Sequence, residues 1–146
     1  SHCTDDMRWV ARRMGPRTAY AYPFRSLLHA RARVALGTDW YVEPLDPMLT
    51  LYAAVTRQSP DGDPPDGWHP DERVSIAQAV DAYTRGSAWA EFREADKGAL
   101  AVGQLADFVI LSCDIINAPA RHILQTRVDL TVVAGQIVHQ HPDATL

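Results

Sequence analysis

The sequence predicts an α/β fold, and three observations support this prediction. In the first part of the chain, short helical patterns surround one short apolar run, and a capped amphipathic helix follows them. Runs of β-branched residues then dominate the last third. Helices that alternate with short buried strands are typical of an α/β layer. The 146 residues, of which 47% are hydrophobic, suffice for about one domain with an apolar core.

Three helices are expected in the first half of the chain. Thr4 or Asp5 can cap a helix over "DDMRWVARRMG", and Gly15 with the following proline would end it. A second helix is expected in "PFRSLLHARA", after its leading proline. A third begins at Asp46 and Pro47 in "DPMLTLYAAVTR", because proline is favoured in a first helical turn.

A short strand is expected between the second and third helices. The apolar run over residues 34–36, closed by Gly37, predicts a buried strand that carries Asp39 to its carboxyl end. In α/β proteins, catalytic groups gather at that end of the strands. An aspartate that only closes a turn or caps a helix would have the same local sequence. Asp39 is therefore a candidate catalytic residue, and the local pattern leaves this structural alternative open.

The second half of the chain predicts a loop, a helix and a small β unit. Residues 58–72 are dense in Pro, Gly and Asp, which indicates a long surface loop of the kind that forms lids or rims. Ser75 and Gln78 have capping-box spacing at the start of a helix over residues 75–92. Two β runs follow, and Ala134 with Gly135 predicts a hairpin turn.

Composition narrows the expected partners and location. A net charge of -4 argues against nucleic-acid binding, which needs clustered Lys and Arg. No apolar run approaches the roughly 18 to 20 residues of a membrane span, and no leader pattern opens the sequence. We therefore expect a cytoplasmic protein that binds neither nucleic acid nor membrane. Cys3 and Cys113 lie far apart without metal-ligand spacing, so both are expected to be free thiols.

Several stretches together carry a family resemblance, and they occur in this order: "RMGPRTAYAYPFRSLL", "ALGTDWYVEPLDPMLTLYAAVTR", "GWHPDERVSIAQAVDAYTRGSAWAEF" and "KGALAVGQLADFVIL" with "TVVAGQIVH". They resemble the carboxyl-terminal part of the amidohydrolase superfamily, in particular amidohydrolase family 3, the branch with N-substituted formamide deformylases. The resemblance implies that residues 1–97 are the last strand and helices of a (β/α)8 TIM-like barrel. Residues 98–146 would be a β-sandwich segment, and the chain would be the later part of a longer protein.

The resemblance also implies a metal-dependent hydrolase that acts on carbon-nitrogen bonds of a small amide or formamide-like substrate. "GTDW" resembles the end of the eighth barrel strand, where Asp39 would bind a divalent metal, most simply zinc, and act as catalytic proton acceptor. A metal lowers the pKa of bound water towards about 7, which makes it a nucleophile. The HxH pair of the family does not occur in this sequence. We therefore expect this chain to be inactive by itself.

Four further residues are candidates for contact with the substrate. Trp40 and Trp68 could line a pocket, although Trp40 could equally plug a core. His2 follows the position where the resemblance places the segment after the seventh strand, so it could line the site. Arg57, like Arg25, could bind a substrate carboxylate, with a solvated helix face as the structural alternative.

A different class of function is also open. A barrel remnant with a β appendage could act as a non-catalytic structural or association module. A partial barrel exposes strand edges and apolar faces, which favours pairing with another copy. We therefore expect a homo-oligomer, or a separate chain that supplies the missing amino-terminal part of the barrel.

Overall fold

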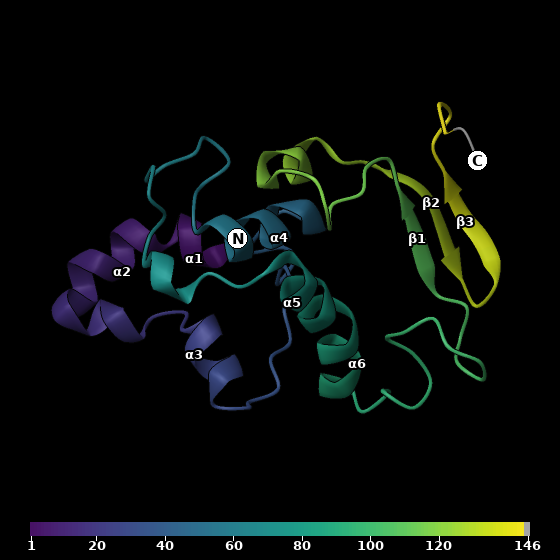
Figure 1. Ribbon diagram of the computed structural model, residues 1–146, viewed down its shortest axis with the longest axis horizontal. Helices are drawn as coiled ribbons and strands as arrows, with labels where there is room; N and C mark the ends of the chain where they lie inside the picture. Colours follow the sequence, from purple (N-terminus) through teal and green to yellow (C-terminus); the bar gives the residue numbers. More distant parts are fainter. Residues whose placement is uncertain (145–146) are drawn as a thin grey trace.

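The computed structural model describes residues 1–144 as a helical body joined to a small antiparallel sheet, which lies at the right of Figure 1. The helices are α1 (His2–Asp5), α2 (Met7–Met14), α3 (Phe24–His29), α4 (Pro47–Thr56), α5 (Ile76–Asp81) and α6 (Ser87–Ala90). The strands are β1 (Phe108–Leu111), β2 (Val128–Val133) and β3 (Gln136–Gln140). Short 3-10 helices lie at Gly15–Tyr20, Pro70–Glu72 and Ala120–Gln125, and a π-helical turn lies at Ala82–Gly86.

Helix α4 is the centre of the apolar core. Asp46 caps it by accepting a hydrogen bond of 2.9 Å from the backbone N–H of Met48, and Pro47 is its first residue. This start confirms the prediction, because both residues satisfy the helix terminus locally. The 3-10 helix Ala120–Gln125 and helix α5 both contact α4. The core comprises Met48, Leu51, Tyr52, Ala54, Val74, Ala79, Ile115 and Ile123.

The predicted helix at the amino end is present but divided. Helix α1 ends at Asp5, and α2 then runs from Met7 to Met14. Gly15 ends α2 with φ of 55°, a left-handed conformation that glycine adopts without steric cost. The expected stop is therefore confirmed, whereas the start lies earlier than predicted.

The helix predicted over residues 75–92 is confirmed, with one irregularity. Ser75 and Gln78 form the reciprocal capping box at the start of α5. The π-helical turn Ala82–Gly86 connects α5 to α6. A Cβ on Gly86 would lie 2.1 Å from the carbonyl oxygen of Val34, so glycine permits the close approach of the segment around residue 34.

The strand predicted over residues 34–36 is wrong. This segment is extended but has no β ladder, and the sheet β1-β2-β3 is the one sheet that the described residues form. Its backbone bonds to the helical run instead: Leu36 N–H donates to the Ala82 carbonyl at 3.1 Å, and the Ser87 hydroxyl donates to the Leu36 carbonyl at 3.0 Å. A strand needs a neighbouring strand, and residues 1–144 place none beside this segment.

The β unit is a three-stranded antiparallel sheet in the order β1-β2-β3. Ala134 and Gly135 join β2 to β3 with φ of 49° and 76°, which is the positive pair that a two-residue hairpin favours. The predicted hairpin is confirmed. The observed architecture is thus a mixture of helices and one antiparallel sheet, a coarser result than the predicted segment of a barrel and sandwich.

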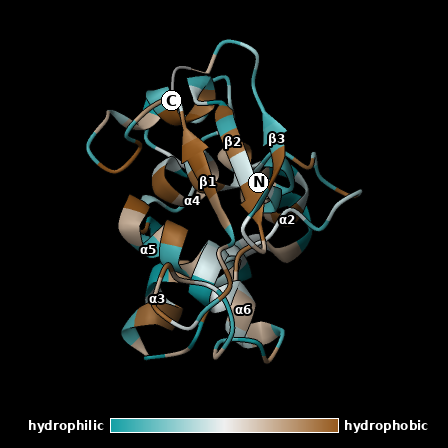
Figure 2. Ribbon diagram, turned by 90° about the vertical axis from the view of Figure 1, so that its right-hand side faces the viewer, coloured by the Kyte–Doolittle hydropathy of each residue, from teal (hydrophilic) through white to brown (hydrophobic). Residues whose placement is uncertain are grey.

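The sheet exposes much of its apolar surface. All five residues of β3 are exposed, with Ile137 at 62% and Val138 at 61%. Figure 2 faces this side of the molecule and shows brown, hydrophobic stretches along the strands. Strand β3 pairs only with β2, so its other edge is free within residues 1–144.

Two sequence expectations concern single features of the chain. Cys3 is buried, Cys113 is half-buried, and both are free thiols, as predicted. Across residues 1–144 no helix combines the length and apolar character that crossing a bilayer requires.

Candidate functional site

The loop that follows residues 34–36 presents Asp39 to solvent. Asp39 has φ of 52°, in the left-handed region that aspartate enters more readily than most residues. Its carbonyl accepts a hydrogen bond of 2.8 Å from Val42 N–H, which closes a tight turn. The side chain of Asp39 is 75% exposed. The turn therefore directs a free carboxylate outward, whereas its backbone has the structural role that the local sequence also allowed.

His2 and Asp39 lie side by side although the sequence separates them widely. Nε2 of His2, from α1, lies 3.8 Å from Oδ2 of Asp39. Its other ring nitrogen, Nδ1, lies 3.9 Å from Oε1 of Glu43. Both distances exceed a hydrogen bond, so the contacts are electrostatic. One imidazole is thus placed between two carboxylates of the same loop.

Glu43 was missed by the sequence interpretation. Its side chain is 7% exposed, whereas glutamate is rarely buried without a partner. Its position in the same loop as Asp39 is the signal that could have identified it. Burial of a carboxylate in an acidic, proline-rich loop is set by distant contacts that local patterns do not report.

The two candidate tryptophans are not brought together. Trp40 is 62% exposed and meets the ring of Tyr41 edge-on, with centroids 6.5 Å apart. Trp68 is half-buried, lies edge-on to Tyr22 at 6.2 Å, and is 5.5 Å from the guanidinium of Arg57. Among the described residues, neither ring forms an aromatic contact with the other. Their contact with a substrate therefore stays a prediction.

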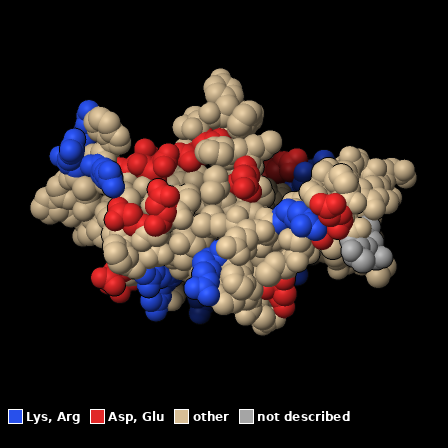
Figure 3. All heavy atoms as spheres, turned by 90° about the horizontal axis from the view of Figure 1, so that it is seen from above, with Lys and Arg blue, Asp and Glu red and all other residues tan. Residues whose placement is uncertain are grey.

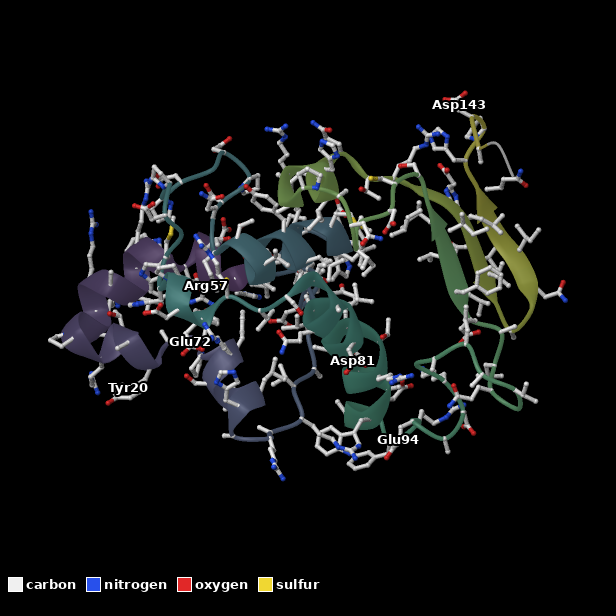
Figure 4. The ribbon with its side chains drawn as sticks, viewed as in Figure 1. Tyr20, Arg57, Glu72, Asp81, Glu94 and Asp143 are labelled. Carbon is white, nitrogen blue, oxygen red and sulfur yellow. The ribbon has the colours of Figure 1, made fainter. Side chains whose placement is uncertain are left out.

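Arg57 has neither of the roles that the sequence suggested. It is 0% exposed, so it lies neither on a solvated helix face nor open to a substrate carboxylate. Its Nε donates to the carbonyl of Trp68 at 2.9 Å and its Nη1 to the carbonyl of Tyr22 at 3.0 Å. Its guanidinium also lies 5.2 Å from the ring of Phe24. Figure 4 shows this side chain within the helical body, where burial lowers its pKa.

The thiol beside this site is unsuited to nucleophilic chemistry. Cys3 is 2% exposed, and burial raises the pKa of its thiol, although the charge of Arg57 opposes the shift. The thiolate, and not the thiol, is the nucleophile and metal ligand. The chemistry available here is therefore that of the two carboxylates and the imidazole.

The described residues offer part of a metal site. Within residues 1–144, no group of three or more His, Cys, Asp or Glu side chains could hold a metal ion. His2 and Asp39 supply two donors, and a zinc site takes three or four protein ligands. Nε2 of His2 is buried and has no hydrogen-bond partner in this part of the chain, so it is a free donor that faces Asp39. This pair does not make a metal site by itself.

Surface charge is mixed on the face shown in Figure 3, where acidic and basic side chains alternate over short distances. A basic group stands at the end of the molecule that carries α2, which contains Arg8, Arg12 and Arg13. On that face, acidic side chains lie next to the basic group.

Comparison with known proteins shows the ancestry of the chain. The sequence model of the amidohydrolase family, in its family 3 branch, matches residues 1–139. "Protein LONG AFTER FAR-RED 3" of Arabidopsis thaliana is 42% identical over 113 residues, which is 76% of this chain and 19% of that protein. "Putative amidohydrolase YtcJ" of Bacillus subtilis (strain 168) is 33% identical over 138 residues, 92% of this chain and 26% of that protein.

A third relative is "N-substituted formamide deformylase" of Arthrobacter pascens, 29% identical over 119 residues, 82% of this chain and 21% of that protein. The chain thus spans between 19% and 26% of the length of these curated relatives. The match to the family covers residues 1–139, which confirms the resemblance in the sequence. The chain belongs to the amidohydrolase family, in its family 3 branch.

Proposed function

We propose that this chain is the later part of a metal-dependent hydrolase that cleaves carbon-nitrogen bonds of a small amide or formamide-like substrate. Family membership and the names of two relatives, an amidohydrolase and a deformylase, support this reaction class. The observation that carries the proposal is the convergence of Asp39 and His2, at 3.8 Å, after an extended segment. A divalent metal, most simply zinc, would supply activation of the attacking water.

The residues of this chain would move protons. Hydrolysis of an amide needs a base that takes a proton from water and an acid that returns one to the leaving nitrogen. Asp39 is the proposed base, because its carboxylate is exposed and has no hydrogen-bond donor within residues 1–144. His2 stands beside it and lines the site, and its buried Nε2 can hold or release a proton. Trp40 and Trp68 are proposed to shape the substrate pocket.

The fold proposal is that residues 1–97 form the last strand and helices of a TIM-like barrel, followed by a β-sandwich segment. The extended segment 34–36 is held along α5 by the bonds from Leu36 and Ser87, in the manner of a strand beside its helix. A strand supplied by the rest of the longer protein would complete its pairing. This would place Asp39 at the carboxyl end of a barrel strand, where such enzymes act.

The test uses the full-length protein with an N-substituted formamide as substrate. Asp39→Ala should lower kcat by about 10²–10⁴-fold, the usual contribution of an acid-base group, and leave the circular dichroism spectrum unchanged. Asp61→Ala is the matched control, because Asp61 is an exposed loop aspartate away from the site. An Asp39→Ala protein with the activity of the control would contradict the proposal.

A metal assay on this chain separates the two classes of function. Plasma mass spectrometry on the purified chain would detect about one metal per chain only if Asp39 and His2 recruit further ligands. Loss of that metal in Asp39→Asn would assign it to this site. Absence of metal would indicate that the remaining ligands belong to the rest of the protein.

The second candidate is a non-catalytic association module. Its specific support is the free edge of β3, with Ile137 and Val138 exposed. Natural sheets usually protect such an edge with charged residues or proline, and "QIVHQ" contains neither. We propose a homo-oligomer on this basis. Light scattering that gives only the monomer mass of 16.2 kDa would contradict it.

A further inference from the structure

The carboxylate of Glu43 has a single polar neighbour among the described side chains. It is 7% exposed, and its one ion-pair contact within residues 1–144 is Nδ1 of His2 at 3.9 Å. A buried carboxylate is costly unless a proton donor compensates it. The carboxylate therefore favours an imidazole that carries its hydrogen on Nδ1.

The opposite nitrogen faces a weaker competitor. Asp39 also lies near the ring, with Oδ2 at 3.8 Å from Nε2, but its side chain is 75% exposed. Water screens the charge of an exposed carboxylate, whereas the charge of a buried one acts through a lower dielectric. A neutral imidazole has one N–H and one lone pair. Glu43 thus competes better than Asp39 for the single N–H of His2.

We infer that Glu43 is a positioning residue, which holds neutral His2 in the Nδ1–H form so that the Nε2 lone pair faces Asp39. The structure supports this assignment independently, because Nε2 is buried and has no hydrogen-bond partner among residues 1–144. A carboxylate that orients the far nitrogen of a functional histidine is a recurrent arrangement in proteins. The functional meaning of this inference rests on the proposed role of Asp39, whereas the tautomer itself does not.

The tautomer can be read directly on the chain by long-range 1H–15N NMR of the histidine rings, at about pH 8, above the pKa of about 6.5 of free histidine. His2→Ala assigns the His2 signals by their disappearance. We expect Nδ1 of His2 to show the shift of a protonated nitrogen and Nε2 that of an unprotonated one. The reverse pattern, with the hydrogen on Nε2, would overturn the inference.

Three variants locate the cause. Glu43→Leu removes the acceptor, so the His2 signals should move to the averaged positions of an imidazole that exchanges between both tautomers. Glu43→Asp keeps a carboxylate and should restore the Nδ1–H pattern in part. Asp39→Asn should leave it unchanged. If Glu43→Leu does not fold, the wild-type pattern and the pair Glu43→Asp and Asp39→Asn still decide the question.

This experiment involves no turnover. A protonated Nδ1 together with an active Asp39→Ala enzyme would support the role of Glu43 and contradict the proposed function. A protonated Nε2 with an inactive Asp39→Ala enzyme would do the opposite. The failure of one proposal is therefore distinguishable from the failure of the other.

Discussion

The helical body and the three-stranded sheet contain similar apolar residues but cover them differently. Ile123 is 1% exposed against α4, whereas Ile137, in β3, is 62% exposed. The helical body surrounds its apolar side chains with α4, α5 and the 3-10 helix Ala120–Gln125. Beyond the hairpin edge, the described residues supply no further layer. Burial is therefore set by what a neighbouring element supplies, and residue type alone does not determine it.

The two regions also meet incompletely. A groove of about 430 Å³ lies between them, and apolar side chains of both line it, among them Met48, Leu51, Tyr83, Phe108 and Val132. Apolar surface left at such a groove contributes less stabilisation than the same surface in a closed core. We expect mutations in the helical body to cost more than equivalent mutations in the sheet.

The largest expected difference is between two isoleucines. Ile123→Ala should lower the free energy of unfolding by about 2–5 kcal/mol, because it leaves a cavity in the core. Ile137→Ala should change it by less than about 0.5 kcal/mol, as surface substitutions usually do. Urea denaturation followed by circular dichroism measures both values. Equal losses would show that the sheet is covered in solution, for example by another copy of the chain.

The next effect concerns the buried arginine. Arg57→Met keeps much of the side-chain volume but leaves the carbonyls of Trp68 and Tyr22 without their donor. Hydrogen bonds to a charged group contribute about 1.5–3 kcal/mol each, so we expect a loss of about 3 kcal/mol. Arg25→Met is the control, because Arg25 is exposed and makes one long contact of 3.4 Å. Similar melting temperatures of the two variants would contradict the structural role of Arg57.

Features determined by a few consecutive residues could be predicted from the sequence. Asp46 at the start of α4, the capping box of α5 and the turn at Ala134 are examples, because each satisfies its own backbone locally. Features determined by distant partners could not. Arg57 is buried by carbonyls far from it in the chain, and Glu43 is compensated by His2 from α1.

The unformed strand has the same cause. Residues 34–36 have the apolar pattern of a strand, yet a strand exists only with a partner, and the described residues bond this segment to a helix instead. The candidate site shows both limits. Asp39 was found because a motif carries it, whereas its contact with His2 depends on how α1 folds back towards the loop.

A smaller effect is expected at the cap of the central helix. Asp46→Ala removes the acceptor for Met48 N–H and should lower the free energy of unfolding by about 1 kcal/mol. Asp46→Asn keeps an acceptor oxygen and should lose only a few tenths of that amount. Chemical denaturation of both variants makes the measurement. If Asn and Ala cost the same, the cap hydrogen bond does not account for the loss.

The smallest effect is a pH dependence within the helical body. The hydroxyl of Tyr22 donates to Oδ2 of Asp6 at 2.9 Å, and burial together with this bond raises the pKa of Tyr22 to about 12. In the unfolded chain a tyrosine ionises near pH 10, so between about pH 10 and 12 the folded chain holds a proton that the unfolded chain has lost. The contribution of Tyr22 is therefore complete below pH 10 and is lost as the pH rises towards 12. Tyr22→Phe should show a shallower fall of stability across this range, whereas Tyr20→Phe, at a site that is 80% exposed, should follow the wild type. Parallel curves for the wild type and Tyr22→Phe would mean that the bond to Asp6 does not persist in solution.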